Sequence, residues 1–245
     1  MDSCKDSRFT LIPVCVKIRR YHFKGEPYLK LTVKRIAESL IMLAISAVLW
    51  QIMLIPVADT INAKAPLSLP QNIIAFVGFL IPVILINLYA AKQNYLNWKE
   101  LKADRYFFKW FIFGLIATVA VHFIATGIGY IEGEYYFSGS ENSGVRYLVI
   151  DLMTAWVLSP LAEELVFRRI LTTVIFPGNL KISLVITGII FAAIHLPMTA
   201  GDWVNQLGAA AILSIIYYKT KRVELCILVH ILMNIFVTIV AWMAP

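Results

Sequence analysis

The chain has 245 residues, of which 60% are hydrophobic and 15% are charged, and its mean hydropathy is +0.75. This composition excludes a soluble globular domain and indicates a protein with several membrane-spanning helices. Its three scattered cysteines have no Cys-x-x-Cys spacing, which excludes a disulfide framework. The net charge of +7 follows membrane topology and does not form a nucleic-acid-binding patch.

Residues 1–35 carry nine lysines and arginines and precede the first long apolar run. No small-residue cleavage site follows that run, so we expect a retained basic segment and not a signal peptide. Apolar residues are interspersed with cations between Leu11 and Ile18. This pattern indicates a cytoplasmic or membrane-surface segment on anionic headgroups, and a solvated basic tail is the alternative.

Seven apolar stretches follow. A helix needs roughly 20 residues to cross a membrane, so the length of each stretch indicates whether it can span. They are expected at about residues 36–57, 72–91, 110–131, 147–176, 181–196, 203–218 and 223–242. Ser159 and Pro160 interrupt the fourth stretch, which predicts a kink or a restart that Ser159 could cap. The sequence therefore predicts an all-α polytopic transmembrane bundle of about seven spans, forming one domain over residues 36–245.

Lysines and arginines alternate between the two sides of this predicted bundle. Nine precede the first span, one follows it, five lie in the next loop and one follows the third span. Over the whole chain, 18 cations fall on one side and two on the other, and Arg168 and Arg169 lie within the fourth span. Because cytoplasmic loops carry the excess of Lys and Arg, this asymmetry predicts a cytoplasmic N-terminus and an external C-terminus.

The fourth predicted span carries two adjacent carboxylates, Glu163 and Glu164, among apolar residues. Ionised groups at membrane depth are costly, so they require partners or a function. Residues four apart share a helix face, so Glu164 can pair with Arg168. Glu163 is rotated from Glu164 by about 100° and remains free to face another group.

Two later spans supply polar groups at one-turn spacing, Phe191-x-x-x-His195 and His230-x-x-x-Asn234. A helical rise of 1.5 Å per residue puts Glu163 and His195 about 20 Å from the turn that joins their helices. His230 and Asn234 lie about 12 and 18 Å from the next inner loop, and helix tilt can bring them to the same layer. We therefore expect Glu163, His195, His230 and Asn234 to line one intramembrane cavity.

Other polar residues in the apolar spans have simpler interpretations. His122 is expected to be an interhelical hydrogen-bond partner, and His22 a residue at headgroup level. Asp151, Asp202 and Asn205 lie near span ends or turns and are expected to be interfacial.

The three motifs, Glu163-Glu164-x-x-x-Arg168, Phe191-x-x-x-His195 and His230-x-x-x-Asn234, resemble in order and spacing the CAAX-protease and bacteriocin-processing (CPBP, or Abi) family of intramembrane endopeptidases. The likeness covers roughly residues 150–240, within a catalytic core at about 147–243. Many members have Arg-Gly where this chain has Arg168-Arg169, which affects packing beside the motif and not the catalytic positions.

The resemblance implies that Glu163 is the catalytic glutamate, with His195, His230 and Asn234 as its partners. The chemistry is consistent with this assignment. A carboxylate in an apolar cavity can activate water, His195 can orient that water or pass its proton to the leaving amine, and His230 and Asn234 can donate to the oxyanion. Glu164 and Arg168 would support Glu163 without reacting. No cofactor is expected in this version.

Zinc held by Glu163, His195 and His230 is the alternative chemistry, although the chain lacks His-Glu-x-x-His. Alternative functions are a non-catalytic membrane immunity or regulatory protein, a CAAX-type prenyl-protein endopeptidase, and a small transporter with a proton relay. The expected partners are the lipid bilayer and a membrane-associated peptide or protein, such as a pheromone or bacteriocin-type precursor. The expected location is a prokaryotic plasma membrane.

Overall fold

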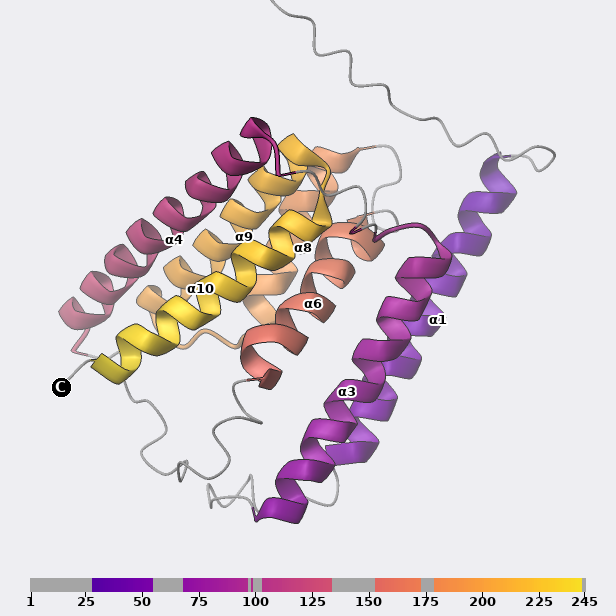
Figure 1. Ribbon diagram of the computed structural model, residues 1–245, viewed down its shortest axis with the longest axis horizontal. Helices are drawn as coiled ribbons and strands as arrows, with labels where there is room; N and C mark the ends of the chain where they lie inside the picture. Colours follow the sequence, from indigo (N-terminus) through magenta and orange to yellow (C-terminus); the bar gives the residue numbers. More distant parts are fainter. Residues whose placement is uncertain are drawn as a thin grey trace, which may run out of the picture.

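Figure 1 shows the computed structural model, in which residues 28–54, 68–96, 98, 103–133, 153–172 and 179–243 are described. His22, Asp151 and most of the basic N-terminal segment lie outside the described residues. The described part of the chain is entirely helical apart from turns and short connections, which confirms the prediction of an all-α protein.

Seven helical rods lie in the described parts of the chain. Six are α1 (Tyr28–Leu54), α3 (Leu69–Lys92), α4 (Arg105–Ile131), α8 (Leu180–Ile194), α9 (Ala200–Thr220) and α10 (Val223–Met243). The remaining rod, the fourth helix, is the continuous run of η4 (Thr154–Leu158), α6 (Ser159–Glu164) and η5 (Leu165–Ile170). Within the described residues, three helices are long and apolar enough to cross a membrane: Leu69–Lys92, Arg105–Ile131 and Val223–Val240. Shorter apolar segments lie at Ile36–Ser46 and Leu180–Ile194, and the protein is a helical membrane protein.

Several helices begin earlier than the apolar runs predict. The first begins at Tyr28 and not near Ile36, and α4 begins at Arg105 and not at Trp110. Asp104 explains the start of α4, because its carboxylate accepts a hydrogen bond from the Phe107 backbone N–H at 2.7 Å. That bond, reinforced by Arg222, lowers the pKa of the Asp104 carboxyl. Hydropathy marks the apolar part of a helix, whereas the cap marks where the helix begins.

The fourth helix is continuous through Ser159 and Pro160, so the possible cap at Ser159 does not form. Ser159 itself has helical dihedral angles, φ −63° and ψ −55°. The helix changes from π to α geometry at this point. The Ser159 N–H bonds to the carbonyl of Thr154, five residues back, as in a π-helix. The Ser159 hydroxyl donates instead to the carboxylate of Glu163.

In Figure 1, α1 and α3 run side by side, and α3 contacts the fourth helix; α4, α8, α9 and α10 gather on the other side of that helix. The contact between α4 and α9 is the most extensive, because small residues let the two backbones approach. A Cβ atom added to Gly201 would lie 2.8 Å from the Ala125 carbonyl oxygen and 3.1 Å from the Gly129 nitrogen. This close approach of α9 to α4 fixes the positions of two helices that form the candidate site.

We expect Gly201→Ala to lower the free energy of unfolding in detergent by about 1–3 kcal/mol, because the methyl group meets helix backbone that cannot rotate away. Gly127→Ala is the matched control, since a Cβ atom there has nothing within 4 Å. The control should leave stability unchanged or raise it by up to about 1 kcal/mol. Equal stability of the two variants would contradict the close contact between α4 and α9.

Candidate active site

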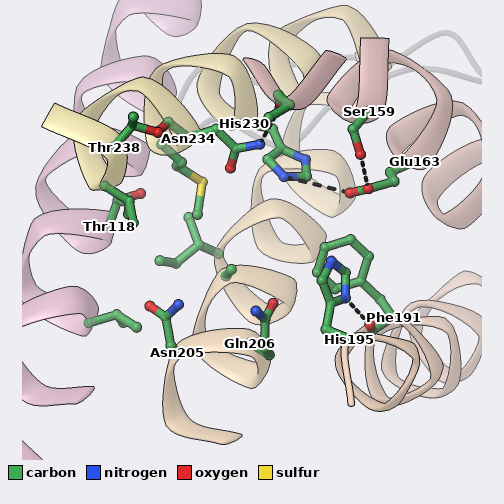
Figure 2. Close-up of a pocket in the computed structure, with 16 residues that line it drawn as sticks. Thr118, Ser159, Glu163, Phe191, His195, Asn205, Gln206, His230, Asn234 and Thr238 are labelled. Carbon is green, nitrogen blue, oxygen red and sulfur yellow. Dashed lines mark hydrogen bonds and ion pairs between the residues drawn. The ribbon is translucent and has the colours of Figure 1, made fainter. Parts of the chain in front are cut away.

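A cavity of about 310 Å³ lies between α4, the fourth helix, α8, α9 and α10 (Figure 2). Its lining contains all four residues predicted to converge, Glu163, His195, His230 and Asn234. The remaining lining residues are Thr118, Val121, Ala155, Ser159, Phe191, Asn205, Gln206, Ala209, Ile212, Met233, Val237 and Thr238. Side chains from five helices therefore meet at a single cavity.

His230 lies between the two adjacent glutamates. Its Nδ1 is 3.0 Å from Oε1 of Glu164, and its Nε2 is 3.7 Å from Oε2 of Glu163. Glu164 in turn pairs with Arg168 through Oε2 and Nε, which are 3.3 Å apart with both side chains fully buried. Glu164, for which we predicted only a supporting contact with Arg168, therefore also binds the His230 ring.

The contacts of His230 fix which ring nitrogen carries a proton. Glu164 is ionised beside Arg168 and can only accept, so the Nδ1–H of His230 donates to it. In neutral His230 the Nε2 lone pair would face the Glu163 carboxylate, and two acceptors would oppose each other. A proton on Nε2 would remove this conflict, place the imidazolium 3.7 Å from the Glu163 carboxylate and make the set of Glu163, His230, Glu164 and Arg168 electrically neutral.

His195 ends α8 and is oriented by the helix itself. The last turn tightens, so that the His195 N–H bonds to the Ala192 carbonyl and the Phe191 carbonyl loses its helical partner. The His195 Nδ1–H donates to that Phe191 oxygen at 2.7 Å. The proton on Nδ1 leaves Nε2 as an acceptor, and Figure 2 shows this nitrogen on the side of the ring toward Glu163.

Asn234 is positioned by the irregular turn before Pro160. In an α-helix the Ala155 carbonyl would accept from the Ser159 N–H, but that N–H bonds to Thr154. A π-turn would offer the N–H of residue 160, which proline lacks. The Ala155 oxygen therefore accepts from Nδ2 of Asn234 at 2.9 Å. The second Nδ2 hydrogen of Asn234 remains available to the cavity.

Phe191 packs against both histidines and the arginine. Its ring is 1% exposed and lies 4.6 Å from the His195 ring and 5.9 Å from the His230 ring, centroid to centroid. The Arg168 guanidinium carbon is 4.9 Å from the centre of the same ring. A cation over an aromatic face is stabilised without a polar partner, which helps to keep Arg168 buried. The aromatic residue of the Phe191-x-x-x-His195 motif thus holds the site together.

Arg169, where this chain departs from the family pattern, points away from the cavity. Its Nη1 donates to the Tyr217 hydroxyl at 3.0 Å, and its guanidinium carbon lies 4.8 Å from the Tyr95 ring centre. The second arginine therefore ties the fourth helix to α9 and to the segment after α3. It is accommodated in packing that does not touch the four cavity residues.

The zinc alternative requires Glu163, His195 and His230 to converge on one point. In the described part of the chain, no three His, Cys, Asp or Glu side chains are arranged to hold a metal ion. As they are arranged, Glu163, His195 and His230 therefore do not form a metal site.

Two polar residues of the cavity were misjudged or missed. Asn205 was expected to be interfacial, but it lines the cavity beside Gln206, for which we made no prediction. The nearby Asp202 is indeed at a helix end, where it forms a capping box with Thr199. The spacing of Asp202, Asn205 and Gln206, within about one turn, was the available signal of a polar helix face. His122 packs edge-on against Phe236, outside the cavity lining.

Comparison with known proteins gives three findings. Residues 145–236 match the family model described as type II CAAX prenyl endopeptidase Rce1-like. The chain is 26% identical over 180 residues to "Putative membrane peptidase YdiL" of Bacillus subtilis, covering 69% of this chain and 70% of that protein. It is 28% identical over 181 residues to "Membrane-embedded CAAX protease MroQ" of Staphylococcus aureus, covering 66% and 70%. No solved structure gives a significant match.

We expect Glu164→Gln to lower the free energy of unfolding by about 3–5 kcal/mol, because it leaves the buried Arg168 charge without its ion-pair partner. Adding Arg168→Met should return at least about 1 kcal/mol of this loss, since the second change removes the uncompensated charge. Thermal or denaturant unfolding of the purified variants measures both effects. A double variant no more stable than Glu164→Gln would contradict the ion pair.

Proposed function

Because the chain belongs to the Rce1-like type II CAAX prenyl endopeptidase family, we propose that it is an intramembrane endopeptidase which hydrolyses a peptide bond in a membrane-associated peptide or protein. The observation that carries the proposal is the position of His230 between Glu163 and Glu164, at the wall of a cavity that also contains His195 and Asn234. The proposed setting is a bacterial plasma membrane, with about seven spans and a cytoplasmic N-terminus.

In the proposed reactive state, His230 is protonated on both ring nitrogens and Glu163 is ionised. The Ser159 hydroxyl holds one Glu163 oxygen, and the other faces the cavity near His230. A water molecule between Glu163 and the Nε2 lone pair of His195 is oriented by both acceptors. As the water oxygen attacks the carbonyl carbon of the substrate, its proton passes to Glu163.

The attack places a negative charge on the former carbonyl oxygen. The Nε2–H of His230 and the second Nδ2–H of Asn234 are the two donors available to that oxygen. One preorganised donor of this kind is typically worth about 3 kcal/mol of barrier. Glu163 then gives its proton to the amide nitrogen, the C–N bond breaks, and a carboxylic acid and an amine are released, which ionise to a carboxylate and an ammonium. Glu164 acts through His230, since it fixes the tautomer and stabilises the imidazolium.

The proposed substrate class is a pheromone, a bacteriocin-type precursor or a similar membrane-associated peptide. A prenylated C-terminal motif is the second candidate, and the CAAX wording of the family description and of the staphylococcal relative favours it. A non-catalytic immunity or regulatory role would not require the complete set of Glu163, His195, His230 and Asn234 to remain around one cavity.

We expect Glu163→Gln and His195→Ala to lower peptide cleavage by at least about 100-fold, because each removes a group that activates water. Mass spectrometry of membrane peptides from cells with each variant, compared with cells lacking the protein, measures the loss. Glu38→Gln is the matched control, since Glu38 lies on α1 and its carboxylate accepts from Gln93. Full biological activity of both site variants, with normal membrane insertion, would favour the binding role.

We expect cleavage by the purified protein to survive extensive treatment with EDTA and 1,10-phenanthroline, because the proposed reaction uses only Glu163 and its partners. Cleavage rate and bound metal, measured by elemental analysis on the same samples, test this point. Activity that disappears on chelation and returns with zinc would replace the glutamate mechanism by a metal-dependent one.

A further inference from the structure

We infer that Trp156 and Thr238 are positioning residues, which hold the Asn234 amide in the direction from which it donates to the oxyanion. The inference rests on the proposed function and deepens it, since Asn234 has a part in the reaction only if the chain is an endopeptidase. Neither Trp156 nor Thr238 lies within the three motifs that supply the reacting groups.

Two hydrogen bonds join α10 to η4, the first π-helical turn of the fourth helix. Nδ2 of Asn234 donates to the Ala155 carbonyl at 2.9 Å. The indole Nε1–H of Trp156 donates to Oγ1 of Thr238 at 3.1 Å. Ala155 and Trp156 are adjacent in η4, while Asn234 and Thr238 are one turn apart on α10. The two bonds therefore form a clamp that holds one turn of α10 against one turn of the fourth helix.

The Thr238 hydroxyl connects the two halves of this clamp. Its hydrogen is donated to the main-chain carbonyl of Asn234 at 2.8 Å. A hydroxyl has one hydrogen and two lone pairs, so Oγ1 can then only accept from the Trp156 indole. Asn234 is thus held through its side chain by Ala155 and through its main chain by Thr238. Figure 2 shows Thr238 beside Asn234 at one end of the cavity, and both residues line it.

A tryptophan near the end of a membrane helix has a simpler interpretation, as an anchor in the aromatic belt. In that role the indole N–H is directed to water or to lipid headgroups. Trp156 is half-buried, and its N–H bonds to a side chain of a different helix. The partner, Thr238, belongs to the same turn of α10 as a predicted oxyanion donor. This combination indicates that Trp156 fixes α10 and does not only anchor the fourth helix in the bilayer.

The direction of Asn234 matters because a preorganised donor is effective only near its correct position. A displacement of about 1 Å can lower a rate by about 100-fold. The contacts of His230 with the two glutamates hold α10 at a point two turns before Thr238. Rotation of α10 about that point would move Asn234 relative to the oxyanion. The clamp provides a second point of attachment to the fourth helix and restricts this rotation.

The test uses the full-length protein in liposomes and a pool of internally quenched decapeptides. Half of the peptides carry a farnesyl group on a cysteine near the C-terminus, which represents the two proposed substrate classes. The peptide that the wild type cleaves fastest, and that Glu163→Gln does not cleave, is the probe for all further measurements. This first comparison establishes whether the proposed function holds.

We expect Trp156→Phe and Thr238→Val each to lower kcat for the probe by about tenfold, with KM changed less than about threefold, because both variants break the clamp without touching the substrate. Thr238→Ser retains the hydroxyl and should keep at least about half of the wild-type kcat. Thr126→Val is the matched control, since Thr126 makes the same hydrogen bond within a helix, to the His122 carbonyl of α4, and is not in the cavity lining.

Asn234→Ala separates positioning from a merely structural role. Alone, it should lower kcat by about 100-fold, because a donor to the oxyanion is removed. Adding Trp156→Phe or Thr238→Val to this variant should then lower kcat by less than about twofold, since no amide remains to be positioned. A structural role would instead lower kcat as much in Asn234→Ala as in the wild type. Thermal unfolding shows which variants are folded, and Trp156→Phe decides if Thr238→Val is not.

The two failures are distinguishable. If no peptide is cleaved in a manner that depends on Glu163, the proposed function fails and the inference falls with it. If the wild type cleaves and Glu163→Gln does not, the proposed function stands and the clamp variants decide the inference. Three results would overturn it: wild-type kcat in Trp156→Phe, a rise in KM without a loss of kcat in Thr238→Val, or an undiminished further loss in the Asn234→Ala background.

Discussion

The structure depends on a buried imidazole held between two carboxylates of the same helix. Glu163 and Glu164 differ by about 100° around that helix, so only a group inserted from outside can contact both. His230 of α10 is that group, at 3.7 and 3.0 Å, and Arg168 completes the charge balance beyond Glu164. Because an uncompensated charge at this depth is strongly unfavourable, α10 has a single acceptable register against the fourth helix. The placement of the reacting groups follows from that register.

Backbone irregularity gives the site its remaining donors and acceptors. Two of the predicted functional side chains are linked to a carbonyl that has lost its helical partner: His195 bonds to Phe191, and Asn234 bonds to Ala155. The first carbonyl is freed by a tightened last turn and the second by a π-turn and Pro160. Local deviations from α geometry are thus what orient the two side chains, and they occur on the helices that border the cavity.

Much of this arrangement could be predicted from the sequence. Apolar runs located the helices, and equal depth along three of them selected Glu163, His195, His230 and Asn234. The contact between Glu164 and His230 could not be predicted, because residues 66 positions apart meet only through a specific rotation of two helices. The sequence left open whether Ser159 and Pro160 kink the fourth helix or restart it, because serine before proline is a common helix start, and the π-turn keeps the helix continuous. Asn205 was judged by its distance from a turn, whereas the face of α9 on which it lies decides its environment.

Hydropathy describes two of the helices that form the cavity poorly. Two of its walls, α4 and α10, qualify as membrane spans, but α9 does not, and α8 has only 15 residues, or about 22 Å. A hydrocarbon core of roughly 30 Å is longer than that, so α8 can end, with His195, inside the membrane layer. The first turns of α9 then continue at the same depth with Asp202, Asn205 and Gln206. Lipid could not accept such a polar backbone and side-chain surface, but a water-containing cavity can. The short helix and the polar helix therefore both agree with the proposed function, in which water and a peptide meet Glu163 within a membrane.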